Sequence, residues 1–190
     1  MQFLNSRNFI FKKLTSELPK GLYYHCISHT QDVVSVAGFL AEKEKVNPYQ
    51  TKLILTAASY HDSGFLYCHD GHEEASCLIA KENLPLFNYS TEEIELICGI
   101  IRATRIPQSP KTPLEQIIAD ADLDYLGRDD YFTLSNQLFK ELLYSGLIND
   151  DKEWHSLQIN FIESHKYFTK TSISLREEKK QLNLKKLKLG

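Results

Sequence analysis

The sequence predicts an all-α protein, and three observations support this fold class. Apolar residues recur at intervals of three and four along almost the whole chain, whereas runs that alternate apolar and polar residues are scarce. The 190 residues are enough for one well-buried core, but two independent domains would both be small. No internal repeat and no linker interrupts the pattern. We therefore expect a single domain over residues 1–190, built as a helical bundle of eight or nine helices.

The first four helices are delimited mainly by proline and glycine. The first stops before the segment "LPKG", and the second ends where Pro48 disfavours helix at the residue before it. Gly64 is a plausible residue to close the third helix. A loop between Gly64 and Gly71 precedes the fourth. The expected helices cover residues 2–17, 24–45, 49–64 and 72–83.

The later helices carry clearer start and stop signals. Ser90 and Glu93 form a capping-box pattern before an apolar run, which indicates a helix start. Three prolines between residues 107 and 113 then mark a loop, and Gly146 closes a later helix. The expected helices cover residues 90–104, 113–127, 129–145, 150–168 and 171–187, and the last two should pack on the rest of the domain.

Composition and charge exclude several classes of protein. The net charge of −3 provides no overall basic field, so we expect no nucleic acid partner. The longest apolar runs are far shorter than the roughly 20 residues that span a bilayer, and the N-terminus lacks the pattern of a secretion signal. These features predict a cytoplasmic protein without membrane contact. In that compartment the cysteines are expected to be free thiols without a catalytic role: Cys26, Cys68, Cys77 and Cys98.

The segment "ASYHDSGFLYCHDGHEEAS" contains two adjacent His-Asp pairs in different settings. His61 and Asp62 end a predicted helix on its apolar stripe, so both should point inward. A buried carboxylate needs a partner, which is either the neighbouring histidine or a divalent cation. His69 and Asp70 lie between glycines without an apolar stripe, and they are expected to be a solvated loop pair or the rim of a site.

Other histidines and aspartates lie on predicted inward faces. His29 continues into an apolar helix stripe, whereas His25, four residues earlier, reads as a helix-start residue. His72 opens the next helix, where an imidazole can meet an anion or simply cap the helix. In "IIADADLDYLGRDD", Asp122 follows the apolar spacing and should point inward, while Asp120 lies on another face. These acids could alternatively favour a helix start through its dipole.

Taken together, these residues resemble the HD-domain superfamily of metal-dependent phosphohydrolases, whose motif is H…HD…D. The resemblance includes "HTQDVV", "AASYHDSGF", "HEEAS", "IIRAT" and "IIADADLDYLGRDD", and it covers about residues 20–145. It implies the all-α bundle of the HD phosphodiesterase type. It also implies metal ligation by His29, His61 and Asp62, with Asp122 as the fourth ligand and Asp120 as the fallback, because the register after "DAD" differs from the usual pattern.

The resemblance also implies a chemistry. Two imidazoles and two carboxylates suit one divalent ion such as Mn, Mg, Fe, Co, Ni or Zn, and they favour one ion over two. Such an ion activates water for attack on phosphorus. Asp62 could orient the water, and His72 could bind the phosphate or protonate the leaving group. Three nearby basic residues are candidates for binding the phosphate: Arg102, Arg105 and Lys111.

The expected function is hydrolysis of a phosphate ester, in a nucleotide or a nucleotide-like small molecule. The alternative is a non-catalytic HD module that binds a nucleotide or a protein partner with a structural metal. The sequence "HDSGF" lacks the lysine of the HD-GYP branch, and the extra histidines of that branch and of the di-iron oxygenase branch are missing. A cyclic-di-GMP phosphodiesterase or an oxygenase is therefore disfavoured, and the pattern leaves a homo-oligomer open.

Overall fold

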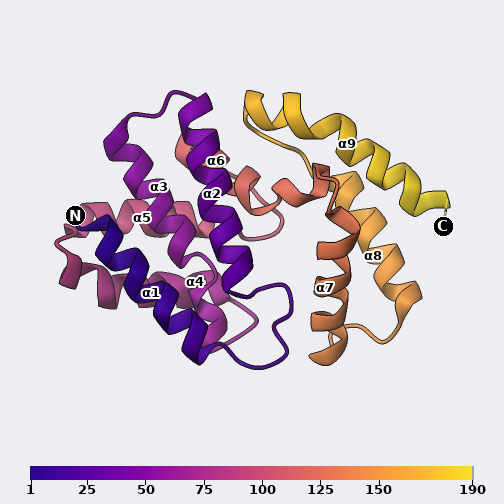
Figure 1. Cartoon of the computed structure of the whole chain (residues 1–190), viewed down its shortest axis with the longest axis horizontal. Helices are drawn as coiled ribbons and strands as arrows, with labels where there is room; N and C mark the ends of the chain where they lie inside the picture. Colours follow the sequence, from indigo (N-terminus) through magenta and orange to yellow (C-terminus); the bar gives the residue numbers. More distant parts are fainter. Residues whose placement is uncertain (190) are drawn as a thin grey trace.

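The structure, a computed structural model, describes residues 1–189 and forms helices throughout, with no strand in that range (Figure 1). The predicted all-α class is therefore confirmed. The α-helices are α1 (Phe3–Glu17), α2 (Ile27–Lys43), α3 (Pro48–Tyr60), α4 (His72–Asn83), α5 (Thr91–Arg102), α6 (Pro113–Asp122), α7 (Tyr131–Tyr144), α8 (Asp151–Ser164) and α9 (Lys170–Leu189). Three short 3₁₀ helices join them: η1 (Ser63–Leu66), η2 (Leu84–Phe87) and η3 (Asp124–Gly127).

Side-chain caps explain where several helices begin. The side chain of Asn47 accepts from the backbone of Gln50 at the start of α3, with proline in the first turn. The capping box expected at Ser90 and Glu93 is present at the start of α5. A second capping box, between Thr112 and Glu115, starts α6.

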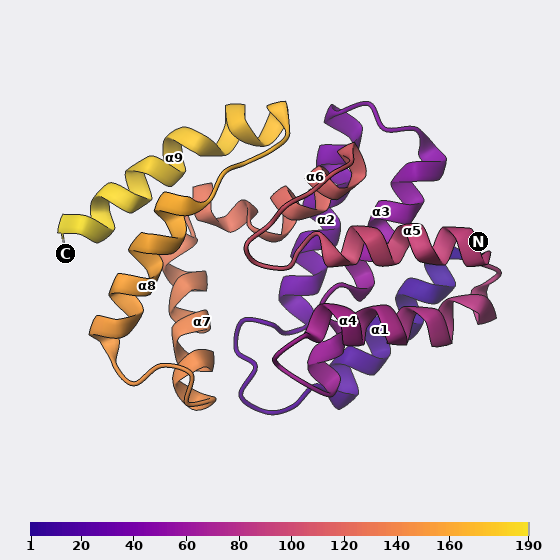
Figure 2. The ribbon, with the colours of Figure 1, turned by 180° about the vertical axis from the view of Figure 1, so that it is seen from behind.

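The helices form two parts that lie side by side along the long axis (Figures 1 and 2). We call α1 to α6 the first lobe, and η3 with α7 to α9 the second lobe. The main core fills the first lobe, where α3 packs against α1, α2, α5 and α6. A smaller apolar cluster in the second lobe joins η3 to α7, α8 and α9, and it includes Tyr24 from the loop before α2. The two chain ends point away from each other (Figure 1).

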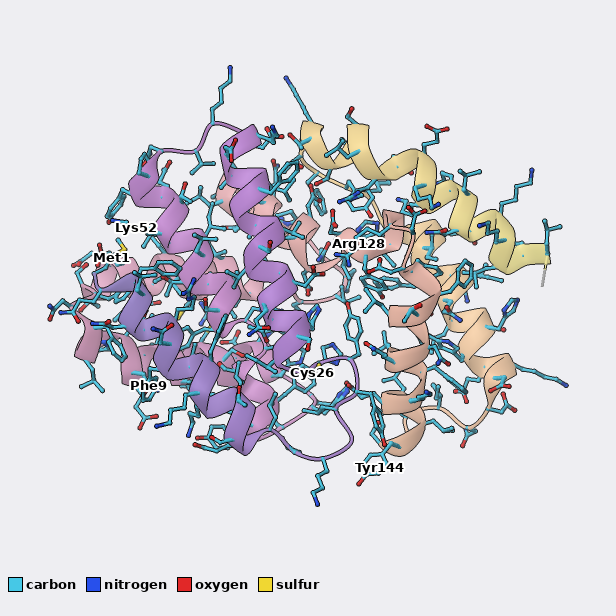
Figure 3. All side chains as sticks on the ribbon, viewed as in Figure 1. Met1, Phe9, Cys26, Lys52, Arg128 and Tyr144 are labelled. Atoms are coloured by element: carbon cyan, nitrogen blue, oxygen red, sulfur yellow. The ribbon has the colours of Figure 1, made fainter. Side chains whose placement is uncertain are left out.

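Buried carboxylates of one lobe bind groups of the other. Glu141 on α7 accepts hydrogen bonds from the backbone nitrogens of Tyr24 and His25. Asp120 on α6 accepts from the backbone nitrogens of Phe168 and Thr169 just before α9. Figure 3 shows Tyr144 at the end of α7, beside the loop that leads into α2, and its ring meets that of Tyr23 edge to face. These contacts set the position of the second lobe relative to the start of α2.

Three predicted helix ends are wrong: the helix expected over residues 150–168 ends at Ser164, and the other two errors lie near the predicted metal ligands. The third helix ends at Tyr60 and continues as η1, and Gly64 does not cap it in a left-handed conformation. Gly64 is needed because a Cβ there would lie 1.9 Å from the carbonyl oxygen of His72. The helix expected over residues 113–127 ends at Asp122 and continues as η3. Both breaks fall directly beside predicted metal ligands.

Within residues 1–189, no helix combines the length and the apolar character needed to cross a membrane. The longest helix, α9, has 20 residues but carries many charged side chains.

The close approach of η1 to α4 predicts the effect of adding one methyl group. Gly64→Ala should lower the free energy of unfolding by about 1–3 kcal/mol, because the backbone of His72 must shift. Gly99→Ala is the matched control: no atom lies within 4 Å of its added Cβ, and alanine favours helix by about 0.5–1 kcal/mol. Urea unfolding measures both, and equal effects at the two positions would contradict the packing described.

We expect the buried histidine at the end of α8, His165, to make the protein less stable in acid. Burial, together with the nearby Lys180 ammonium, lowers the pKa of His165 to about 4. The unfolded chain binds a proton at this histidine near pH 6.5, whereas the folded protein binds it only near pH 4, so stability falls as pH drops through this window. The loss attributable to His165 should reach about 2–3 kcal/mol at pH 4.5.

Urea unfolding of the His165→Gln variant at pH 7 and pH 4.5 tests this. The variant should lose less stability between the two pH values than the unchanged protein. His155→Gln on the same helix is the control and should keep the full decline. An unchanged decline in His165→Gln would show that the acid sensitivity arises elsewhere.

Candidate metal centre and adjoining cavity

The four predicted metal ligands converge from three helices of the first lobe. His29 lies in the first turn of α2, while His61 and Asp62 directly follow the last residue of α3. Asp122 is the last residue of α6. Because α2 packs against both α3 and α6, the start of one helix meets the ends of the other two. His61 is completely buried, and Asp62 is 5 % exposed.

The polar atoms of these side chains face one another at short range. His29 Nε2 lies 3.2 Å from Asp122 Oδ1, 3.3 Å from Asp62 Oδ2 and 3.4 Å from His61 Nε2. His61 Nε2 lies 3.1 Å from Asp62 Oδ2 and 3.5 Å from Asp122 Oδ1. Atoms that share one metal ion at 2.0–2.2 Å are separated by about 3.0–3.5 Å at tetrahedral or octahedral angles. His29, His61 and Asp122 therefore have the spacing of ligands around one ion, and Asp62 lies beside both imidazoles.

One atom of the cluster is left without a hydrogen bond. Asp62 Oδ2 is buried and has no hydrogen-bond partner among residues 1–189, although two imidazole nitrogens lie within 3.3 Å. A buried carboxylate oxygen without a partner is costly, and a cation would satisfy it. The donor set and this oxygen both fit a divalent ion.

The electrostatics of the cluster explain how it holds together without an ion. Burial opposes protonation of His29, but its hydrogen bond with Asp122 and the nearby Asp62 raise its pKa to about 9. Despite burial, the adjacent Asp62 raises the pKa of His61 well above its ordinary value. Although burial acts in the opposite direction, the two imidazoles lower the pKa of Asp122 to about 2. A cation must displace these imidazole protons, so metal affinity should increase with pH.

Hydrogen bonds outside the cluster orient its central histidine. His61 Nδ1 donates to the carbonyl of Ala58 at 2.9 Å, which leaves Nε2 to face the carboxylates. The hydroxyl of Ser76 donates to the carbonyl oxygen of His61 at 2.6 Å. The same hydroxyl oxygen accepts from the backbone nitrogen of Gly64 at 2.7 Å. Ser76 on α4 thus holds the turn that carries His61 and Asp62. Sequence reasoning missed this residue, because a serine on an apolar helix face gives no signal by itself.

His72, predicted to handle the phosphate, lies next to the cluster. Its Nδ1 donates to the carbonyl of His69 at 3.0 Å, and its Nε2 lies 3.6 Å from Asp62 Oδ1. Its ring stacks on Phe65, with the ring centroids 4.1 Å apart. The ring of His25 also stacks on Phe65, with the centroids 4.4 Å apart, and lies 6.3 Å from the ring of His72.

His25 and Glu141 form a pair that sequence reasoning did not identify. The buried carboxylate of Glu141 makes a short contact with His25 Nδ1, and this contact helps to lower the pKa of Glu141 although burial opposes the change. The two residues are 116 positions apart, so no local pattern could connect them.

The predicted basic residues lie outside the cavity. Arg102 donates to Glu74 at 2.9 Å, and Arg105 also pairs with Glu74, at 3.1 Å. The ammonium of Lys111 donates to Ser109. Their role in binding phosphate stays a prediction.

The two remaining aspartates of the predicted site have different surroundings. Asp120, the fallback ligand, is fully buried and turns away from the histidines toward the second lobe. Its oxygens accept from two backbone nitrogens and from the hydroxyl of Thr169. Asp70 is fully exposed, while its neighbour His69 lines the cavity. Of the aspartates in "DADLD", the structure brings Asp122 to the histidines.

A cavity of about 330 Å³ opens beside the cluster, between the two lobes. One end is lined by Asp62, Asp122 and His72, and the other by side chains of η3, α7 and α8. Most of the lining at that second end is aromatic or aliphatic. Pockets of this size bind small organic molecules.

The whole chain is similar to two solved structures. Bacillus subtilis YpgQ in complex with ADP superposes with a TM-score of 0.69 at 21% sequence identity, covering 100% of this chain and 95% of that one. A predicted HD superfamily hydrolase from an uncultured Thermotogales bacterium superposes with a TM-score of 0.66 at 18% identity, covering 97% of this chain and 88% of that one. At these identities the similarity shows the shared fold.

No curated protein matches this chain. Its family is shown instead by a sequence profile. The sequence profile of the HD domain matches residues 26–124, which is just over half of the chain and includes His29, the His61 and Asp62 pair, and Asp122. The chain therefore belongs to the HD domain family.

Proposed function

We propose that the protein is a phosphohydrolase that cleaves a phosphate ester of a nucleotide or nucleotide-like molecule, using a single divalent ion. The ligands are His29, His61, Asp62 and Asp122. The observation that carries the proposal is the spacing of these side chains: His29, His61 and Asp122 place ligand atoms within 4.8 Å of one another, and Asp62 Oδ2 lies 3.3 Å from His29 Nε2 and 3.1 Å from His61 Nε2.

In the proposed reaction, a metal ion and two side chains of the protein have separate roles. A divalent ion held by these ligands supplies Lewis-acid stabilisation of negative charge and lowers the pKa of water. The second carboxylate oxygen of Asp62 faces the cavity side, 3.6 Å from His72 Nε2, where it can orient the attacking water. His72 keeps Nε2 for the substrate, because Nδ1 is bound to the carbonyl of His69. From this position it can donate to the phosphate or to the leaving oxygen.

Two observations support a nucleotide-like substrate. The solved YpgQ structure is a complex with ADP, which is a property of that protein. In this chain, the cavity beside the cluster has aromatic walls and a volume of about 330 Å³, enough for a ring system linked to a phosphate.

The proposal predicts that metal and activity are lost together. His61→Ala and Asp62→Ala should each lower the metal content of the purified protein, because each removes a ligand. They should also lower kcat on a phosphate ester panel by on the order of 10³-fold. His155→Ala, at a position of α8 that does not line the cavity, is the control and should retain both. Elemental analysis and phosphate release measure the two effects.

Full activity in either ligand variant would overturn the proposed mechanism. One bound metal without turnover of any phosphate ester would instead favour a non-catalytic HD module with a structural ion.

The two aspartates of α6 predict opposite phenotypes. Asp122→Asn should reduce metal content, because the amide is a much weaker ligand than the carboxylate. Asp120→Asn should keep the metal and lower the free energy of unfolding by about 1–3 kcal/mol, because an amide cannot accept all the hydrogen bonds from Phe168 and Thr169. Metal analysis and urea unfolding separate the two. Metal loss in Asp120→Asn with metal retained in Asp122→Asn would reverse the ligand assignment.

A further inference from the structure

The cavity beside the metal cluster contains an apolar chamber, which we define as the part lined by the second lobe. The first lobe contributes Asp62, Asp122 and His72 at one end, and the chamber extends from them as one continuous space of about 330 Å³ in total. Its apolar walls come from η3, α7 and α8: Tyr125, Tyr131, Leu138, Leu142, Trp154 and Phe161. A molecule that reacts at the cluster therefore places its remaining part against these side chains.

The charge around the cavity limits how many phosphates it can hold. Among residues 1–189, no lysine or arginine lines it, whereas Asp62, Glu73 and Asp122 do. A divalent ion is already balanced by the two ligand carboxylates, so little positive charge remains for a substrate. Two arginines lie just outside the lining: Arg102 pairs with Glu74, and Arg105 pairs with Glu74 and, at 3.6 Å, with the lining residue Glu73. One phosphate can bind at the ion and His72, but the further charges of a diphosphate or triphosphate would meet no lysine or arginine in the cavity.

Two polar side chains, Ser135 and Gln158, interrupt the apolar walls. Gln158 on α8 is 9 % exposed, and its Oε1 accepts hydrogen bonds from the hydroxyls of Tyr131 and Ser135. For its Nε2, no hydrogen-bond partner exists within the described part of the chain, and Gln158 lines the cavity. The two hydroxyls therefore hold the amide oxygen of Gln158 in place, and its Nε2 group can donate a hydrogen bond to a polar atom of a ligand.

We propose that the substrate is a phosphate monoester with a single phosphate, whose alcohol part is an uncharged and mainly apolar ring system that occupies the chamber. This inference rests on the proposed phosphohydrolase activity and deepens it. A polar atom at the edge of the ring system meets the amide of Gln158. In the reaction, a new bond forms from a water oxygen to phosphorus and the ester P–O bond breaks. The released alcohol oxygen takes up a proton, and inorganic phosphate remains.

The chamber can be tested without any turnover, because Trp154 is the single tryptophan of the chain and lines it. Its fluorescence should respond, in a saturable way, to benzylphosphonate, which cannot be hydrolysed. Methylphosphonate lacks the ring and should bind about tenfold more weakly or worse. Equal affinity for the two phosphonates, or no response to benzylphosphonate, would overturn the chamber assignment.

Kinetics test the number of phosphates and the character of the alcohol. kcat/KM should be at least about tenfold higher for benzyl phosphate than for glycerol phosphate, and higher for adenosine monophosphate than for the triphosphate. Preference for the triphosphate or for glycerol phosphate would overturn the proposal. If benzylphosphonate binds but no phosphate ester is turned over, the proposed activity fails while the chamber assignment is supported.

A charge placed at the chamber should weaken binding of a ligand that carries an apolar ring. Leu157 lines the cavity and is 43 % exposed, so Leu157→Lys should fold. This variant should bind benzylphosphonate at least about tenfold more weakly, because its ammonium must be desolvated beside an apolar ring. Leu182→Lys, at an equally exposed position of α9 outside the cavity, is the matched control and should bind like the unchanged protein. Equal weakening in both variants would contradict a role for the chamber.

Discussion

The burial of two imidazoles and two carboxylates at one point is the constraint on which the rest of the structure depends. Each of these groups would be costly in an apolar interior alone, and together they lower the cost by sharing charge. That arrangement requires the start of α2 to meet the ends of α3 and α6. The breaks after Tyr60 and Asp122 serve this requirement, because a continued helix would carry the side chains away from the common point.

The second lobe provides the apolar wall of the cavity that adjoins the cluster. Buried carboxylates at Glu141 and Asp120 tie it to the loop before α2 and to the end of α6. The cavity consequently has a polar end with ligand side chains and an apolar wall from α7 and α8. Under the proposed function, the first lobe performs the chemistry while the second lobe selects the organic part of the substrate.

The two His-Asp pairs have the same residues, but their positions in the fold give them different surroundings. His61 and Asp62 follow a buried helix and face two further ligand groups, whereas Asp70 is fully exposed in a loop. His69 nevertheless lines the cavity and accepts through its carbonyl from His72, so the second pair supports the neighbouring histidine. Arg102, which is half-buried, and Arg105, which is exposed, have carboxylate partners on α4, as surface basic residues commonly do.

Local patterns in the sequence determined the helices, because apolar periodicity, capping residues and prolines act over a few neighbouring positions. The ordered motif likewise determined the family. The sequence left the choice between Asp120 and Asp122 open, because both follow the same apolar run and only the packing of α6 sets which one faces His29. The Glu141 contact with His25 and the apolar chamber were also decided by tertiary structure. The contact joins residues 116 positions apart, and the chamber adjoins the cluster only because the two lobes pack together.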